Sequence, residues 1–129
     1  MKKAGALFTA LAVSMFVASV AIAEVVGAPL WNPTAAQVSR VEAIAKRPRH
    51  VKALSKYQRH YAGATVAGRK VIEGRWIEVD WSDPPTIGVA KIEPYAALPA
   101  VLDGGCSIVT VIYDVATDKI AMIECNGLA

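Results

Sequence analysis

The residues of this chain that are best suited to chemistry are Asp80, Asp83 and His60. The two carboxylates flank Trp81, and carboxylates beside a histidine can serve as general acid and base. A glycosidase would need a second carboxylate facing them across a cleft, and Asp83 precedes two prolines, as turn residues do. A small hydrolase or lyase that uses these three residues is therefore the alternative interpretation, and it requires their side chains to converge.

The other reactive residue types lack the spacing that catalysis or metal binding needs. His50 and His60 belong to no H-x-x-x-H motif, the chain has no C-x-x-C motif, and both histidines are expected at the surface or in a hairpin. No serine lies in a G-x-S-x-G motif, and Asp103-Gly104-Gly105 lacks the lysine and the helix of a phosphate loop. The sequence predicts no catalytic residue, no metal and no cofactor, and it favours a protein that is not an enzyme.

Cys106 and Cys125 are the only cysteines, and each lies near the outer end of a β-rich run. The runs are Ser107–Tyr113 and Lys119–Cys125, and the polar turn between them predicts a β-hairpin. An even pair of cysteines in an exported chain predicts a disulfide rather than a metal site or a nucleophile. Closing a loop of this size should stabilise the fold by roughly 3 kcal/mol.

The turn of this hairpin predicts a register. A four-residue loop with Asp118 in the left-handed conformation suits the sequence between the strands. The cysteines then share a face but are offset by one pair, so a bulge or bend is expected at Gly104-Gly105. Both faces of the hairpin are apolar, which predicts a sheet that is at least partly covered on both sides. The expected opposite pairs are Asp114 with Lys119, Ile112 with Ala121, and Ile108 with Cys125.

Basic residues are concentrated between Ala43 and Ile72, where no acidic residue occurs, whereas most acids follow Glu73. One interpretation is a patch for an anionic partner, and the favoured one is mutual neutralisation of the two halves across the sheet, for example by Arg59 with Glu78. Nucleic acid is not expected, because aromatic residues are not interleaved with the bases and the chain is predicted to be exported. The candidate patch residues are Lys46, Arg47, Arg49, Lys52 and Lys56.

The first 23 residues have the pattern of a signal peptide. Met1-Lys2-Lys3 is a positive start, Ala4 to Ala23 carries no charge, and Ala21-Ile22-Ala23 is a small-x-small cleavage site before Glu24. Removing Lys2 and Lys3 reduces the formal net charge of +3. The sequence therefore predicts a periplasmic or secreted protein with a single small domain over 24–129 and no transmembrane segment after cleavage.

The domain is expected to begin with one helix. Thr34 and Gln37 fit a capping box, and apolar residues recur at helical spacing until Pro48 ends or kinks the helix. A second short helix could cover 50–57. Strands are expected at 57–67, 71–81, 86–93 and in the C-terminal hairpin.

Two strands, 57–67 and 71–81, are expected to form a hairpin that turns at Gly68-Arg69. Its expected register pairs Val66 with Val71, Tyr61 with Trp76, Arg59 with Glu78, and Gly63 with Gly74. The paired glycines would leave a dent in the sheet that a helix, or less readily a ligand, could fill.

The element order predicts an α+β domain, with the helix packed on an antiparallel sheet of about four strands. This order resembles the cystatin-like or NTF2-like roll in topology alone, and no residue role follows from it.

The three tryptophans are expected to serve packing rather than a sugar platform. The favoured function is a non-enzymatic binding or interaction module that uses the exposed side of its sheet, with a protein or an anionic envelope component as partner. A further alternative is an envelope-associated structural protein whose basic patch faces lipid.

Overall fold

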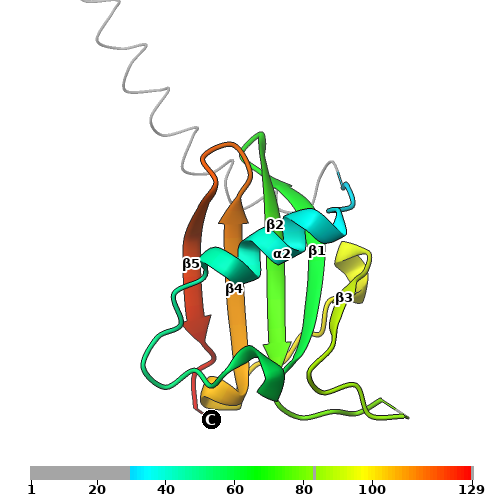
Figure 1. Cartoon of the computed structure of the whole chain (residues 1–129), viewed down its shortest axis with the longest axis vertical. Coiled ribbons are helices and arrows are strands. Elements are labelled where there is room, and N and C mark those ends of the chain that lie inside the picture. The colour runs from blue at the N-terminus through cyan, green and yellow to red at the C-terminus, as the bar shows by residue number, and fades with distance from the viewer. Residues whose placement is uncertain (1–29, 83, 129) are drawn as a thin grey trace, which may run out of the picture.

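A computed structural model describes residues 30–82 and 84–128 of the chain. The predicted signal peptide, residues 24–29, Asp83 and Ala129 lie outside the described residues. The structure is an α+β domain in which one α-helix crosses a five-stranded mixed sheet (Figure 1). No helix in the described part of the chain is long and apolar enough to cross a membrane.

The sheet has the strand order β3-β1-β2-β4-β5. All neighbouring pairs are antiparallel except β1 and β3, which run parallel. The expected sheet of about four antiparallel strands is therefore wrong in one respect, because the predicted strand over 86–93 is reduced to a short parallel edge strand. The cystatin-like or NTF2-like order is not confirmed. The strands are β1 (Gln58–Val66), β2 (Arg69–Ile77), β3 (Ala90–Ile92), β4 (Ile108–Asp114) and β5 (Lys119–Cys125).

The helix α2 (Ala35–Ile44) has the predicted capping box. The Gln37 backbone N–H donates to Thr34 Oγ1 over 3.1 Å, and the Thr34 backbone N–H donates to Gln37 Oε1 over 2.8 Å. The helix ends before Pro48, as a proline requires. In place of the expected second helix, the following segment makes a single 3-10 turn, Leu54–Lys56.

The core lies between α2 and the sheet. Val38 and Val41 of the helix are buried against it. The Tyr61 hydroxyl donates to Glu42 of the helix (2.7 Å) and accepts from Trp76 Nε1 (2.9 Å), and burial raises the pKa of Tyr61. The buried sheet residues of this cluster are Tyr57, Tyr61, Ile72, Trp76, Val109, Val111 and Tyr113.

The predicted register of the β1–β2 hairpin is wrong by two residues. Val66 pairs with Arg69, and the turn is Ala67-Gly68, both with positive φ (50° and 76°). Two such residues make the tight turn whose twist matches a hairpin, so the two-residue turn lies one residue earlier than the predicted Gly68-Arg69. Because the shift is even, every side chain keeps its predicted face. The predicted pair of Arg59 with Glu78 does not form.

The two glycines of this hairpin are not paired, and no helix fills a dent between them. Gly63 lies under Trp31, which forms an antiparallel bridge with it, and Gly74 lies under the ring of Tyr61. A Cβ on Gly63 would meet the Trp31 carbonyl and would lie 2.7 Å from its ring. The close approach of these aromatic residues to the backbone therefore requires glycine.

The C-terminal hairpin combines confirmed and wrong predictions. Asp114 pairs with Lys119, and Asp118 has the expected positive φ of 53°. A register shift after this turn makes Ile112 pair with Met122, not with Ala121. The extra residue in β5 is a β-bulge, and it moves every later residue of the strand by one place.

The bulge changes which face Cys125 occupies. Cys125 pairs with Val109, not with Ile108, and its side chain packs on the helix side of the sheet. Gly104 and Gly105 have φ of 103° and 56°, which is the bend expected ahead of Cys106. The predicted disulfide between Cys106 and Cys125 is present, with a Cα–Cα distance of 4.5 Å.

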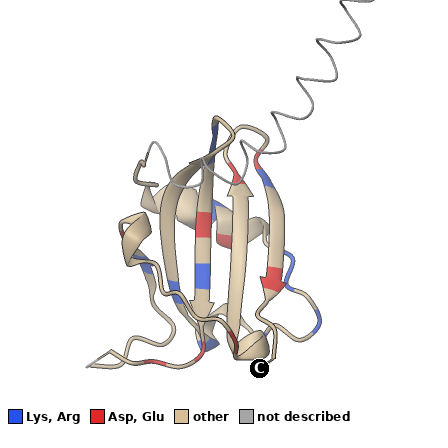
Figure 2. Ribbon diagram, turned by 180° about the vertical axis from the view of Figure 1, so that it is seen from behind, with Lys and Arg blue, Asp and Glu red and all other residues tan. Residues whose placement is uncertain are grey.

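The side of the sheet that faces away from α2 is crossed by the segment between β3 and β4 (Figure 2). Arg75 Nη1 donates to the Pro99 carbonyl over 2.7 Å, and the Tyr95 hydroxyl donates to Glu73 over 3.3 Å. This side was expected to carry the binding surface, but it is largely buried over β1 and β2. Its buried residues are Gln58, His60, Ala62, Ala64, Val71, Glu73, Ile77 and Ile108.

Candidate functional site

Among the described residues, half of the exposed large apolar side chains lie between β2 and β3, in residues 78–82 and 84–89, which we call the β2–β3 loop. It extends sideways from the lower end of the sheet in Figure 1. Trp81 has 65% of its surface exposed, and Val79, Ile87 and Val89 are also exposed. Large apolar side chains that cluster in solvent typically mark an interaction surface.

Asp80 holds the β2–β3 loop in shape. Its carboxylate accepts from the Ser82 hydroxyl, from the Ser82 amide over 2.8 Å, and from the Thr86 amide. These donors, the Ser82 hydroxyl first, lower the pKa of Asp80. The carboxylate therefore stays ionised and closes the loop on itself, so the exposed Trp81 beside it is carried by an ordered turn.

A chain of polar side chains joins this loop to β1 and β3. Gln58 Nε2 donates to Thr86 Oγ1 and lies 3.4 Å from Asp80 Oδ1. Gln58 Oε1 lies 2.6 Å from His60 Nε2, and His60 Nδ1 contacts the Glu93 carboxylate just beyond β3. The order of the chain is thus Glu93, His60, Gln58 and then Asp80 with Thr86.

The prediction places His60 at the surface or in a hairpin, and the hairpin position is confirmed. The residue lies in a hairpin strand, but it is 7% exposed, because Gln58, Glu93 and the covering segment enclose it. His60 and Asp80 are connected through Gln58, and Asp83 lies outside the described residues. Both ring nitrogens of His60 are occupied by oxygen atoms of the protein. The arrangement suits a structural link better than a base that must reach a substrate.

Sequence reasoning missed Gln58, Glu93 and Thr86. Gln58 and His60 alternate along one strand, which places both on the same face, and this signal was available. Glu93 and Thr86 reach them only because β3 returns parallel to β1. Among the described residues, no group of three or more histidine, cysteine or acidic side chains is placed to hold a metal ion.

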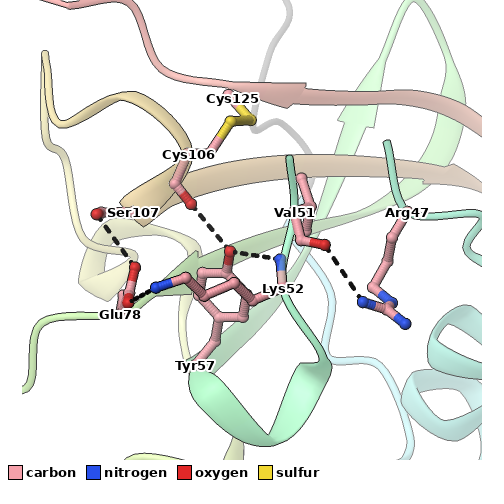
Figure 3. Close-up of a disulfide and its surroundings, with 8 residues drawn as sticks. All are labelled: Arg47, Val51, Lys52, Tyr57, Glu78, Cys106, Ser107 and Cys125. Carbon is pink, nitrogen blue, oxygen red and sulfur yellow. Dashed lines mark hydrogen bonds and ion pairs between the residues drawn. A yellow bond between two sulfur atoms is a disulfide. The ribbon is translucent and has the colours of Figure 1, made fainter. Parts of the chain in front are cut away.

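The candidate basic patch follows α2 as an irregular segment. Lys52 forms an ion pair with Glu78, and Arg47 Nη1 donates to the Val51 carbonyl over 3.3 Å (Figure 3). Lys46, Arg49 and Lys56 are exposed and make no ion pair within residues 30–82 and 84–128. Of the five patch residues, one is therefore neutralised directly and three project into solvent.

Tyr57 fastens this segment to the disulfide end of the sheet, as Figure 3 shows. Its buried hydroxyl donates to the Cys106 carbonyl over 2.9 Å and accepts from the Lys52 amide over 3.1 Å. Beside it, Glu78 accepts from Ser107 Oγ over 3.2 Å, and the hydrogen bond from Lys52 lowers the pKa of Glu78. The segment is thus positioned by buried contacts although most of its charges are exposed.

Within the described residues, lysines and arginines that precede Glu73 pair with acidic residues that follow it in three places. The pairs are Lys52 with Glu78, Arg69 with Asp114, and Arg40 with Asp118. The Arg40 guanidinium, with the Tyr113 hydroxyl, lowers the pKa of Asp118 to about 2. These contacts agree with mutual neutralisation of the two halves, and an anionic partner for the remaining bases stays a prediction.

Reversing the charges of Lys46, Arg47 and Arg49 together to glutamate should leave the melting temperature almost unchanged. These residues are exposed, and exposed charges contribute only tenths of a kcal/mol each to folding. Thermal unfolding followed by circular dichroism checks this result. Lys52→Glu is the matched control, since it places a carboxylate beside Glu78 and should lower the melting temperature more than the triple change does. A large drop for the triple variant would show that these bases are structural partners.

Two hollows lie away from the β2–β3 loop. One, of about 380 Å³, has Val71, Ile112 and Ala121 in its lining and lies beside the Arg69–Asp114 pair. The other, of about 430 Å³, lies between the end of α2 and β5, with Ile44 and Lys46 in its lining. Lys46 is the only residue of the basic patch among the described lining residues of either hollow.

Comparisons with known proteins add nothing to this geometry: the chain matches no protein-family model, no curated protein and no solved structure.

Proposed function

We propose that this protein is a non-enzymatic interaction module that docks an apolar surface of a protein partner on its β2–β3 loop, with Trp81 as the anchor. The observation that carries the proposal is an exposed tryptophan held on a loop whose shape is fixed by the Asp80 carboxylate. Tryptophan is enriched among the residues that dominate the affinity of protein interfaces. An ordered loop also loses little conformational freedom on binding, which favours affinity.

The chemistry of the loop favours a protein over an anionic lipid surface. In the sequence, the charged residues of this segment are all acidic, Glu78, Asp80 and Asp83, and acids repel anionic head groups. Its exposed large apolar side chains are a mixture of valine, isoleucine and tryptophan. Mixed aliphatic and aromatic groups match the core of a protein interface. The disulfide favours an oxidising compartment for this interaction, as expected for a periplasmic or secreted protein.

The hydrolase or lyase alternative has less support. It needs His60 and Asp80 to act on a bound molecule, whereas the ring of His60 is enclosed and both its nitrogens contact protein oxygens. Asp80 is surrounded by donors of its own loop. A group engaged in this way must first be released before it can exchange a proton with a substrate.

Site-specific photo-crosslinking in the producing cells tests the proposed docking surface. A photoreactive amino acid at position 87 should give one adduct of discrete mass, and the same group at Ala116 should give none. Ala116 is the matched control because it is exposed in the distant β4–β5 turn. Combining the position-87 crosslinker with Trp81→Ala should reduce the adduct at least tenfold, since an interface anchor contributes about 2 kcal/mol or more.

Three outcomes would contradict the proposal. The first is no adduct at position 87, and the second is an equal yield at positions 87 and 116. The third is an adduct of twice the protein's own mass, which would assign the loop to self-association. Trp81→Ala should keep the melting temperature of the parent protein, because this ring is largely exposed, and a thermal scan separates loss of binding from loss of folding.

A further inference from the structure

The buried ring of His60 faces two oxygen acceptors at once. Nδ1 contacts a carboxylate oxygen of Glu93, and Nε2 lies 2.6 Å from Gln58 Oε1. A neutral imidazole carries one N–H and one lone pair, whereas the imidazolium carries two N–H groups. Both contacts are hydrogen bonds only when the ring is doubly protonated.

The orientation of the Gln58 side-chain amide decides whether His60 Nε2 faces an oxygen acceptor or an N–H donor. Its Nε2 faces Thr86 Oγ1, Asp80 Oδ1 at 3.4 Å and Ser82 Oγ at 3.5 Å. The reversed amide would turn its oxygen toward the ionised Asp80, which can only accept hydrogen bonds. Asp80 therefore holds Nε2 on its own side and leaves Oε1 for the ring of His60.

Both positive and negative side chains surround the ring of His60. Arg75 of β2 and Lys91 of β3 are its register partners, and both oppose a positive ring. Glu93 contacts the ring and favours its positive charge directly, and Asp80 favours that charge through Gln58. On the neighbouring strand, Arg75 forms an ion pair with Glu73, which also accepts from the Tyr95 hydroxyl. Glu93 forms no ion pair with a lysine or arginine in the described chain, so its charge acts mainly on His60.

We propose that His60 is a proton-controlled latch that fastens β3 and the β2–β3 loop to β1. The protonated ring bonds Glu93 on one side and Gln58 on the other, and Gln58 passes the link to Thr86 and Asp80. Loss of one proton leaves a ring lone pair facing either the Glu93 or the Gln58 oxygen. Relieving that repulsion at Gln58 requires reversal of the amide, which turns its oxygen toward Asp80. The latch is therefore closed at low pH and loosened as pH rises.

The consequence for binding rests on the proposed function, because the latch holds the loop that carries Trp81. A loop fastened at low pH presents Trp81 in one position, and a loosened loop must be ordered again by the partner. The latch itself is a property of the free protein.

Amide hydrogen exchange of the free, full domain tests the latch. The Gly88 amide donates to Tyr57 O and the Glu93 amide to Tyr61 O, both over 2.9 Å, so both report on the attachment to β1. Protection factors corrected for intrinsic exchange are compared at about pH 5.5 and about pH 8.5. Protection at these two amides should fall about tenfold at the higher pH, as expected for the loss of one hydrogen bond to a charged group.

Two variants test whether His60 and Glu93 cause the pH dependence of this protection. Glu93→Gln should remove most of the pH dependence, and His50→Gln, which changes the exposed histidine, should retain it. The ring nitrogens of His60 in the parent protein give a readout that needs no variant, since nitrogen NMR shifts distinguish two N–H groups from one. A single N–H at about pH 5.5, or equal protection at both pH values, would overturn the latch. Either result would leave the crosslinking test of Trp81 unaffected.

Discussion

Replacing both Cys106 and Cys125 with alanine should lower the free energy of unfolding by about 2–4 kcal/mol and leave the fold recognisable. The disulfide joins residues separated by 19 positions and closes the open end of the β4–β5 hairpin. Its loss gives the unfolded chain more conformational freedom, and it also removes the crosslink at the residue whose backbone carbonyl accepts from Tyr57. Urea denaturation followed by tryptophan fluorescence measures the change.

The same experiment has an internal control. Reducing the disulfide of the parent protein should shift its denaturation midpoint toward that of the double variant, and reductant should not affect the variant itself. Thiol titration of the denatured, unreduced parent protein should find no free thiol. Two free thiols in the exported protein would contradict the disulfide and would make the cysteines candidates for reactive groups.

Gly63→Ala should destabilise the domain by about 2–3 kcal/mol, a value expected for overpacking in a well-packed region. The added methyl group would meet the Trp31 carbonyl and would lie 2.7 Å from the Trp31 ring, so the bridge between Trp31 and β1 must open. The Trp31 Nε1–Ala64 O hydrogen bond of 2.8 Å would be strained at the same time. Alanine is otherwise at least as favourable as glycine in a strand. A decrease in the free energy of unfolding would therefore indicate the clash with Trp31.

Gly127→Ala is the matched control, because a methyl group there meets nothing within 4 Å. Its denaturation midpoint should equal that of the parent protein. If Gly63→Ala is equally neutral, Trp31 is not packed on β1. If Gly63→Ala is stabilising, the loss of backbone freedom in the unfolded chain outweighs any contact with Trp31.

Several features of the fold were determined by local sequence. The capping box of Thr34 and Gln37 begins the helix, and Asp118 takes the left-handed position of the β4–β5 turn. Each depends on side-chain and backbone preferences within a few residues, which are visible in sequence. The disulfide was predictable because an isolated pair of cysteines on one hairpin has only one way to pair.

Features that depend on a choice between near-equal pairings were not predictable. The β1–β2 register moved by two residues because Ala67 accepts a positive φ, and β5 gained a bulge that reversed the predicted face of Cys125. The even shift leaves every side chain of β1 and β2 on its predicted face, and β5 carries apolar residues on both faces. Burial of apolar surface therefore gives little preference between these registers.

The surroundings of the candidate site depend on the tertiary structure. Sequence showed that Asp80 and His60 were available, but their chemistry depended on residues brought together from three parts of the chain. The parallel return of β3 places Glu93 beside His60, and the fold of the β2–β3 loop places Asp80 and Thr86 beside Gln58. Sequence alone determined which ionisable groups this protein has, and only the tertiary structure decided what each one faces, because hydrogen bonds and charge interactions act over a few ångströms of space.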